Sequence, residues 1–567
     1  MAAVLFLIVS ILIRLVWPRI RPQTHWLCPV LALALSFCVG GFHTATASLL
    51  SAVLLLALLE IRSPRLFLNP AGMAVIVLFA AACVTPLWAA DQGMAAFALP
   101  RYLPLLLYAL FLMQHQDAGQ QVLALVPASG CIMTLLSGLG LLFPQLHSQL
   151  TVNGRLAGFF QYPNSFAAFL LAGLIICFFT NRSRWNFAAT LLLMTGIVLS
   201  GSKTVFVLTM LFLTAAILTT RQWHRGLLLG IALLFGLGLG LLADTLALLP
   251  NAARFTDIRA TSGTFLVRLL YFRDVIPSIL SHPFGLGYKA YPAIEGSIQT
   301  GRYYVTFIHN GFLQQLLEYG WIPTLFLWGV FLVRVISPRT PMLQRFLLLS
   351  VLSHCMMDFD LQFAVFWILI LSCLDLQTGK SIPIRSKKLI PLGAALLTAV
   401  GLWLGAGDWI YRNNQPDACL ALTPFHTEAM TYQLTRCDNP QQLDELADEI
   451  LFLNPTHSLA FSAKANAAFS RGDIRAMTEY KESAIASDRY TTAEYCDYFQ
   501  KLYTAMQLYQ RSGDSASAET CRKKLLQIPR MMEAVSQKTH ALAGMTGDDS
   551  TLVLPPEYTA LLERLNP

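Results

Sequence analysis

Residues 226–249, GLLLGIALLFGLGLGLLADTLALL, decide the fold class, because Asp244 is the single charged side chain in the whole stretch. A helix needs about 20 apolar residues to cross the hydrocarbon core of a bilayer. Comparable apolar runs recur through residues 1–250 and again through 310–410. The sequence therefore predicts an all-α, polytopic transmembrane helix bundle.

Composition and spacing support this prediction. Of the 567 residues, only 13% are charged, whereas a soluble domain carries about 25%. Because the pair of runs within 345–376 could be one broken element, we expect about twelve to fourteen spans. The candidate runs lie at about 2–17, 26–42, 44–61, 71–90, 98–114, 118–142, 164–180, 185–200, 203–219, 226–249, 310–336, 345–357, 361–376 and 389–409.

Basic residues in the short loops predict the orientation. If the spans alternate, these residues fall on one side, which should be cytoplasmic. The loops at 143–163, 250–308 and 358–360, and everything after about 410, then face outward. No A-x-A-like site follows the first apolar run, so we interpret that run as a span. The basic residues are Arg19, Arg21, Arg62, Arg65, Arg182, Arg184, Arg221, Arg225, Arg339, Arg345, Lys380, Arg385, Lys387 and Lys388.

The outer loop at 250–308 is long and basic. Its cations indicate an anionic ligand, although long loops also translocate regardless of charge. Two amphipathic pieces, at about 263–281 and 286–300, and many aromatic residues favour a cap on the membrane surface over disorder. Nothing in the sequence indicates a nucleic acid. The cations are Arg254, Arg259, Arg268, Arg273, Lys289 and Arg302.

Residues 411–567 differ in kind from residues 1–410. Long apolar runs stop, and helical patterns surround the turns Gly472-Asp473 and Gly513-Asp514. Helix pairs around such turns are similar to tetratricopeptide (TPR) repeats, although the spacing exceeds the typical 34 residues. We expect an extracytoplasmic, soluble helical domain that could bind a protein partner.

The cysteines do not indicate a metal site. Four of them, Cys419, Cys437, Cys496 and Cys521, lie in the outward part and could pair in three ways, so their redox state stays open. The sequence has no CxxC motif and no Cys/His ligand spacing, and we therefore expect no metal.

The first polar cluster on the outer side is NGRLAGFFQYPN at 153–164. Pro163 and Asn164 predict a helix start with Asn164 as its cap. Arg155 would lie beside the backbone amides of this helix N-terminus, and the two together could bind a phosphate. The alternative is an arginine that only reaches the membrane surface.

The second cluster is SGSKT at 200–204, in which Lys203 is the only charge between Thr190 and Thr219. Lys203 could be a second cation at the same site or part of an exposed hairpin turn. A further outer cluster, HCMMDFD at 354–360, places Asp358 and Asp360 in an outer turn or a broken helix, where they could position partners or face water.

The remaining cluster is TFIHNGFLQQLLEYG at 306–320. His309 stands at the outer entrance of the expected helix and can act as an acid, a base or a hydrogen-bond donor. Glu318 follows nine residues later, which is about 13 Å deeper and on the opposite face of a regular helix. We therefore expect Glu318 to tie the helix to a neighbour rather than to pair with His309.

Together with PFGLGY at 283–288 and LWAADQGMAAF at 87–97, these clusters resemble the O-antigen ligase/polymerase family over about residues 70–376. The resemblance implies a metal-independent and cofactor-independent glycosyltransferase of the cytoplasmic (plasma) membrane, with its site on the extracytoplasmic side. Such enzymes move glycan from a polyprenyl-diphosphate carrier to an acceptor hydroxyl during surface polysaccharide assembly. The family includes both polymerases and ligases, and its acceptors are glycans, lipids or proteins.

The resemblance also implies roles for single residues. His309 would orient or deprotonate the acceptor hydroxyl, while Arg155 and Arg268 would hold the diphosphate. Lys203 would assist them, although the family more often has arginine there. The remaining expected contributors are Asn164, Asn310 and Tyr288, which would bind substrate, and Glu318 and Asp358, which would support the site.

Three other interpretations stand beside this one. A flippase for lipid-linked oligosaccharides can have as many spans, but the two halves show no paired Gly- or Pro-broken spans. A protein O-oligosaccharyltransferase would use the C-terminal domain to bind its acceptor. A membrane scaffold that only binds other proteins would not explain Arg155, Arg268 and His309.

Overall fold

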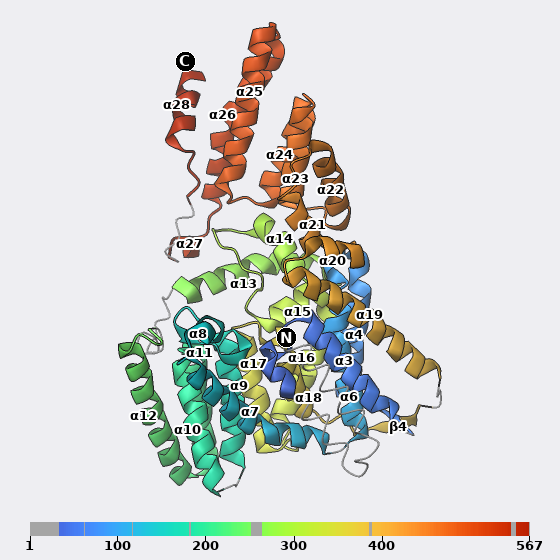
Figure 1. The fold of residues 1–567 in the computed structure, drawn as a ribbon, viewed down its shortest axis with the longest axis vertical. Coiled ribbons are helices and arrows are strands. Elements are labelled where there is room, and N and C mark those ends of the chain that lie inside the picture. Colours follow the sequence, from blue (N-terminus) through green and yellow to red (C-terminus); the bar gives the residue numbers. More distant parts are fainter. Residues whose placement is uncertain are drawn as a thin grey trace.

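The computed structural model describes residues 33–61, 63–115, 117–180, 183–250, 263–384, 388–545 and 551–565. It is almost wholly helical, which confirms the predicted all-α class. The helix bundle lies at the lower end of the molecule in Figure 1, and helices of the C-terminal part stand at the upper end. The segments that carry the polar clusters lie between them.

The bundle is built from apolar helices around one hydrophobic core. Glycines allow close packing, since a Cβ on Gly196 of α10 would lie 2.4 Å from the Leu170 side chain of α9. Small residues at helix crossings are typical of membrane proteins. The helices are α3 (Thr44–Leu59), α4 (Pro70–Val84), α6 (Ala98–Gln114), α7 (Ala118–Gly140), α9 (Pro163–Phe179), α10 (Ser183–Leu199), α11 (Lys203–Thr220), α12 (Trp223–Thr245), α16 (Trp321–Ile336), α17 (Met342–Cys355), α18 (Ala364–Ser372) and α19 (Leu389–Arg412).

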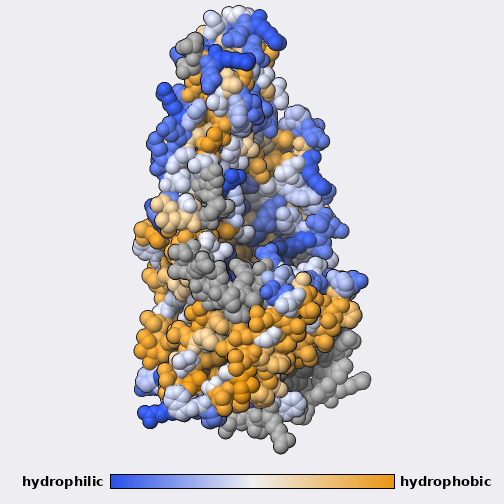
Figure 2. Space-filling view, turned by 90° about the vertical axis from the view of Figure 1, so that its left-hand side faces the viewer, coloured by the Kyte–Doolittle hydropathy of each residue, from blue (hydrophilic) through white to orange (hydrophobic). Residues whose placement is uncertain are grey.

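Six helices among the described residues are long and apolar enough to cross a membrane, and five shorter apolar helices accompany them. Hydrophobic residues form a band over the lower half of the face shown in Figure 2, and hydrophilic residues dominate above it. These findings support a multi-pass membrane protein. The span expected at 2–17 lies outside the described residues, so the number of twelve to fourteen spans stays a prediction.

Three expected spans are interrupted in the structure. The described end of the 26–42 run forms two short 3-10 turns, η3 (Leu35–Phe37) and η4 (Val39–Gly41), because Gly40 and Gly41 take positive φ angles. The 310–336 run breaks at Gly320. The 361–376 run begins with the 3-10 turn η8 (Asp360–Gln362) and contains only the short helix α18.

Short elements complete the membrane part. The antiparallel pair β1 (Arg65–Leu68) and β4 (Lys380–Pro383) joins two distant loops, and β2 (Thr151–Val152) pairs with β3 (Arg155–Leu156). The others are the 3-10 turns η5 (Thr85–Trp88) and η6 (Gly158–Phe160) and the helices α5 (Gln92–Ala95) and α8 (Pro144–Leu150).

Three helices between the two ends carry the outer segments. They are α13 (Gly263–Ser281), α14 (Ala290–Ile298) and α15 (Gly311–Tyr319). The amphipathic piece predicted at about 263–281 is α13, and the second predicted piece contains α14. Both helices pack with α15 into a core of their own.

The C-terminal part consists of helices joined by short turns. Gly472-Asp473 separates α23 from α24, and Gly513-Asp514 separates α25 from α26. Its assignment as a TPR domain with a boundary near residue 410 stays a prediction. The helices are α20 (Pro416–Leu422), α21 (Thr427–Leu434), α22 (Pro440–Leu453), α23 (Ser458–Ser470), α24 (Ile474–Ser487), α25 (Thr492–Ser512), α26 (Ser515–Gln537), α27 (Ala541–Met545) and α28 (Pro556–Leu565).

The C-terminal part is docked on the outer segments. The Arg489 amide donates to the Gly296 carbonyl at 3.2 Å, and the His540 amide donates to the Thr300 carbonyl at 2.8 Å. Buried Asp91, from the turn before α5, accepts from Thr427 Oγ1 at 2.8 Å and from Asn454 Nδ2 at 3.3 Å. The loop that leads to His309 is thus held between the bundle and the C-terminal helices.

Candidate functional site

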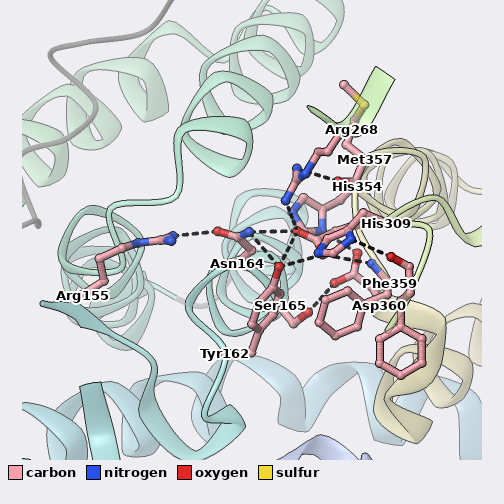
Figure 3. Close-up of polar contacts among 12 residues, drawn as sticks. Arg155, Tyr162, Asn164, Ser165, Arg268, His309, His354, Met357, Phe359 and Asp360 are labelled. Atoms are coloured by element: carbon pink, nitrogen blue, oxygen red, sulfur yellow. Dashed lines mark hydrogen bonds and ion pairs between the residues drawn. The ribbon is translucent and has the colours of Figure 1, made fainter. Parts of the chain in front are cut away.

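Asp358 is the hub of a polar network at the end of the bundle that faces the C-terminal helices. Its carboxylate is buried and accepts hydrogen bonds from Tyr162 OH at 2.9 Å and from Asn164 Nδ2 at 2.8 Å. Arg268 Nη2 completes the set with an ion pair of 3.3 Å. The network brings together α9, α13 and the turn after α17, three segments that lie far apart in the sequence (Figure 3).

The negative charge of Asp358 is balanced by the positive charge of Arg268. Burial alone would raise the pKa of the Asp358 carboxyl, but the Arg268 guanidinium, the foremost of the opposing groups, keeps that pKa below its ordinary value. Arg268 also donates from Nη1 to the Met357 carbonyl at 2.7 Å. Since a guanidinium has five N–H donors, the 17% exposed Arg268 side chain can hold Asp358 and still present N–H groups to a ligand.

His309 lies beside this hub with a defined tautomer. Its Nδ1 is 2.9 Å from the Phe307 carbonyl. A carbonyl only accepts, so Nδ1 carries the proton and Nε2 is left as a proton acceptor. The ring packs against Tyr271 and Phe359, with ring centroids 5.7 and 5.0 Å away.

The state of His309 follows from its surroundings. Burial lowers the pKa of the imidazole below 6.5, although the Asp358 charge opposes the shift. The backbone of His309 has a φ of 54°, a conformation that costs a non-glycine residue about 1–3 kcal/mol. A neutral histidine held at such a cost fits a functional constraint.

A second histidine, His354, lies in the last turn of α17, shortly before Asp358. His354 Nδ1 is 2.5 Å from Asp360 Oδ2, and Ser165 Oγ donates to Asp360 Oδ1 at 2.6 Å. The His354 and Asp360 side chains are about 1% and 0% exposed, so neither reaches a substrate directly. This pair fixes the turn that carries Asp358.

Arg155 approaches Asn164 from the side opposite to Arg268 and His309 (Figure 3). Its Nη2 donates to Asn164 Oδ1 at 2.6 Å and its Nε to the Ser200 carbonyl at 2.8 Å. The SGSKT segment is therefore next to Arg155, as a turn between α10 and α11. Lys203 is the first residue of α11.

Asn164 and Asn310, which were expected to bind substrate, form hydrogen bonds within the protein. The prediction that Asn164 caps α9 is wrong, because the helix already begins at Pro163 and its N-cap is Tyr162. The Asn164 carboxamide is instead bonded to Arg155 and Asp358. Asn310 caps α15 through Oδ1 and donates from Nδ2 to the Met356 carbonyl at 3.0 Å. Asn164 thus remains in the network, and Asn310 ties α15 to the turn after α17.

Tyr288 and Glu318 lie deeper in the molecule. Tyr288 is 5% exposed and packs in the core of the bundle; no contact within the described chain joins it to Asp358. Glu318 accepts from the Lys289 amide at 3.3 Å and from Gln314 Nε2 at 2.7 Å. Gln314 in turn accepts from the Ile308 amide, so Glu318 supports the backbone next to His309.

No role was predicted for Tyr162, Ser165 or His354, and Asp360 was expected only to position partners or to face water. All four lie within quoted segments, 153–164 and 354–360, or directly after them. Their closeness in sequence to Arg155 and Asp358 could have marked these side chains as candidate site residues. Only the fold, however, shows which of them contact one another. Among the described residues, no group of three or more His, Cys, Asp or Glu side chains could hold a metal ion.

Comparison with known proteins gave one match, to a family model. A family model described as O-Antigen ligase matches residues 188–328, which run from α10 into α16 and include Lys203, Arg268, His309 and Glu318. Searches among curated proteins and among solved structures gave no match. The matched segment confirms the resemblance to the O-antigen ligase family for residues 188–328, whereas Arg155 and Asp358 lie outside it.

Proposed function

We propose that this protein is a membrane glycosyltransferase that moves glycan from a polyprenyl-diphosphate carrier to an acceptor hydroxyl during surface polysaccharide assembly. The family match supports a transferase of the ligase/polymerase type in general. The donor, the acceptor, the absence of a metal and the extracytoplasmic position of the site are part of the proposal.

One observation supports the proposal most strongly. His309 offers an unprotonated Nε2 beside the cationic Arg268, because Nδ1 is bound to the Phe307 carbonyl. In the proposed step, the acceptor hydroxyl gives its proton to Nε2 while its oxygen bonds to the anomeric carbon of the donor. The bond from that carbon to the diphosphate oxygen breaks, which inverts the anomeric centre.

Arg268 and Arg155 serve the leaving group. A diphosphate is already a good leaving group, so positioning and charge can provide most of the catalysis. Arg268 is held in place by Met357 and Asp358, and Arg155 by Ser200 and Asn164. Both guanidiniums are therefore preorganised, which lowers the cost of binding a diphosphate between them.

The test is transfer by the purified protein from a polyprenyl-diphosphate-linked repeat unit with a chelator present. We expect His309→Ala to slow transfer by about 10²–10⁴-fold and Arg268→Ala by about 10²–10³-fold. His282→Ala and Arg273→Ala are matched controls, because Arg273 is exposed on α13 and His282 is exposed directly after it. Both controls should keep the wild-type rate.

The reaction products distinguish a polymerase from a ligase. A ladder of growing glycan indicates a polymerase, and a single transfer to an added acceptor indicates a ligase. Full activity of His309→Ala and Arg268→Ala would refute the site. Movement of the lipid between the leaflets of vesicles without any transfer would show a flippase instead.

A further inference from the structure

A cavity of about 590 Å³ opens between the start of α3 and the end of α19. Its volume is within the range of small-molecule sites, about 300–1,000 Å³. His43, Asp408 and Arg412 line it together with Trp409 and Tyr432. Asp408 and Arg412 neutralise each other through an ion pair of 2.9 Å.

A second cavity of about 490 Å³ continues from the first onto the C-terminal part. Pro416 and Tyr432 line both cavities, so the two form one groove. We call them the inner and the outer half of the groove. The inner half lies at the end of the bundle, and the outer half lies between α20, α21 and α22.

The inner half begins one aromatic layer away from His309. His43 in its wall directly follows Phe42, whose ring centroid lies 6.0 Å from that of Phe307 and 6.5 Å from that of Phe359. Phe359 in turn contacts the His309 ring at 5.0 Å. The inner half of the groove and His309 therefore lie on the two sides of one layer of aromatic rings.

The groove has the chemistry of a sugar-binding surface. Trp409, Tyr411 and Tyr432 offer aromatic faces, and Asn413 and Asn414 offer amides, which both donate to and accept from hydroxyls. Nδ1 of His43 is buried and has no hydrogen-bond partner among the described residues. The wall of the cavity thus contains a buried polar atom whose hydrogen-bonding capacity the described residues leave unused.

The charge of the outer half selects against an anion. Asp417, Glu445 and Glu449 face a single cation, Arg436, which stacks on Tyr432 at 4.7 Å. The diphosphate of a lipid carrier would be repelled there. Its cationic partners, Arg155 and Arg268, lie in the Asp358 network instead.

We propose that this groove binds the acceptor glycan, as an uncharged oligosaccharide whose reactive end points toward His309. The inference rests on the proposed function and adds the acceptor path to it. The inner half holds the units next to the reaction, and the outer half holds the following units. Longer acceptors therefore bind more tightly than single units.

The experiment measures transfer from a fixed concentration of lipid-linked donor to soluble, uncharged acceptors of one to several repeat units. For the wild type, KM falls as the acceptor lengthens. Tyr432→Ala raises KM for long acceptors about tenfold at an unchanged kcat, and Tyr432→Phe restores the wild-type KM. Phe452→Ala is the matched control, since Phe452 is 80% exposed on α22 and lines neither cavity.

A carboxylated acceptor of the same length tests the charge of the groove. Its KM is higher than that of the uncharged acceptor. The double variant Glu445→Gln, Glu449→Gln reduces this difference in KM. A KM unaffected by Tyr432→Ala, with transfer still dependent on His309, overturns the groove and leaves the proposed function standing. No transfer by the wild type with any acceptor overturns both.

Discussion

Asp358 and His309 are two titratable groups whose environments drive them to different states. Asp358 accepts hydrogen bonds from Tyr162 and Asn164 and pairs with Arg268, which keeps its pKa low and its charge in place. His309 is surrounded by aromatic rings, and burial keeps it neutral. One group can thus anchor a cation while the other accepts a proton.

This difference predicts the pH dependence of transfer. His309 acts in its neutral form, and its pKa lies below the ordinary 6.5. Transfer should therefore stay constant above that value and fall only as the pH drops through the lowered pKa. The measurement is kcat/KM against pH for the purified protein, fitted to a single acid limb whose midpoint lies below 6.5.

The residual activity of His309→Ala provides the control. The acid limb should vanish in this variant, while His282→Ala should keep it, because His282 is exposed and its Nδ1 is bonded to Ser278 and Ser281. A midpoint above 6.5, or an unchanged limb in His309→Ala, would contradict the assignment of His309 as the base.

At the scale of elements, two glycines determine how the site segments meet. Gly320 ends α15 with a φ of 83°, and an added Cβ would lie 2.4 Å from the Pro283 carbonyl oxygen. Gly285, with a φ of 80°, lies on the other side of this approach, where a Cβ would lie 2.5 Å from the Glu318 carbonyl oxygen. The two backbones are therefore too close for any side chain.

Gly320→Ala should separate these backbones. We expect a loss of stability of about 1–3 kcal/mol from the backbone conformation alone, and a fall in transfer because Glu318 and Gln314 support the residues next to His309. Thermal unfolding in detergent and the transfer rate measure the two effects. Gly329→Ala on α16 is the control, since a Cβ there would meet no atom within 4 Å. Equal behaviour of the two variants would disprove the close approach.

The same break shows where sequence reasoning stops. The helix at 263–281 was predictable because its apolar residues follow the helical period. The 310–336 run looks like one span because its hydropathy is continuous, and only the packing against Pro283 and Phe284 explains the turn at Gly320. Likewise, Arg155, Arg268 and His309 were identifiable as polar residues at the outer side, whereas the central position of Asp358 depends on tertiary contacts across α9, α13 and α17.

At the scale of the whole molecule, the basic strand pair β1–β4 and the C-terminal helices lie at opposite ends. The β1–β4 pair, which carries Arg65 and Lys380, lies at the lower end in Figure 1, and α22–α26 stand at the upper end. Basic loops face the cytoplasm in most membrane proteins. The site, the groove and the C-terminal helices should therefore share the extracytoplasmic side.

Labelling with a membrane-impermeant maleimide tests this orientation in intact spheroplasts. In a variant whose other cysteines are replaced, the partly exposed Cys437 between α21 and α22 should react without lysis. Ser381→Cys in β4, placed in the same background without Cys437, should react only after lysis. The reverse pattern would place the C-terminal helices in the cytoplasm. His309 and the groove would then be on the wrong side for a donor that is used outside, because the C-terminal part is docked directly on the loop before His309.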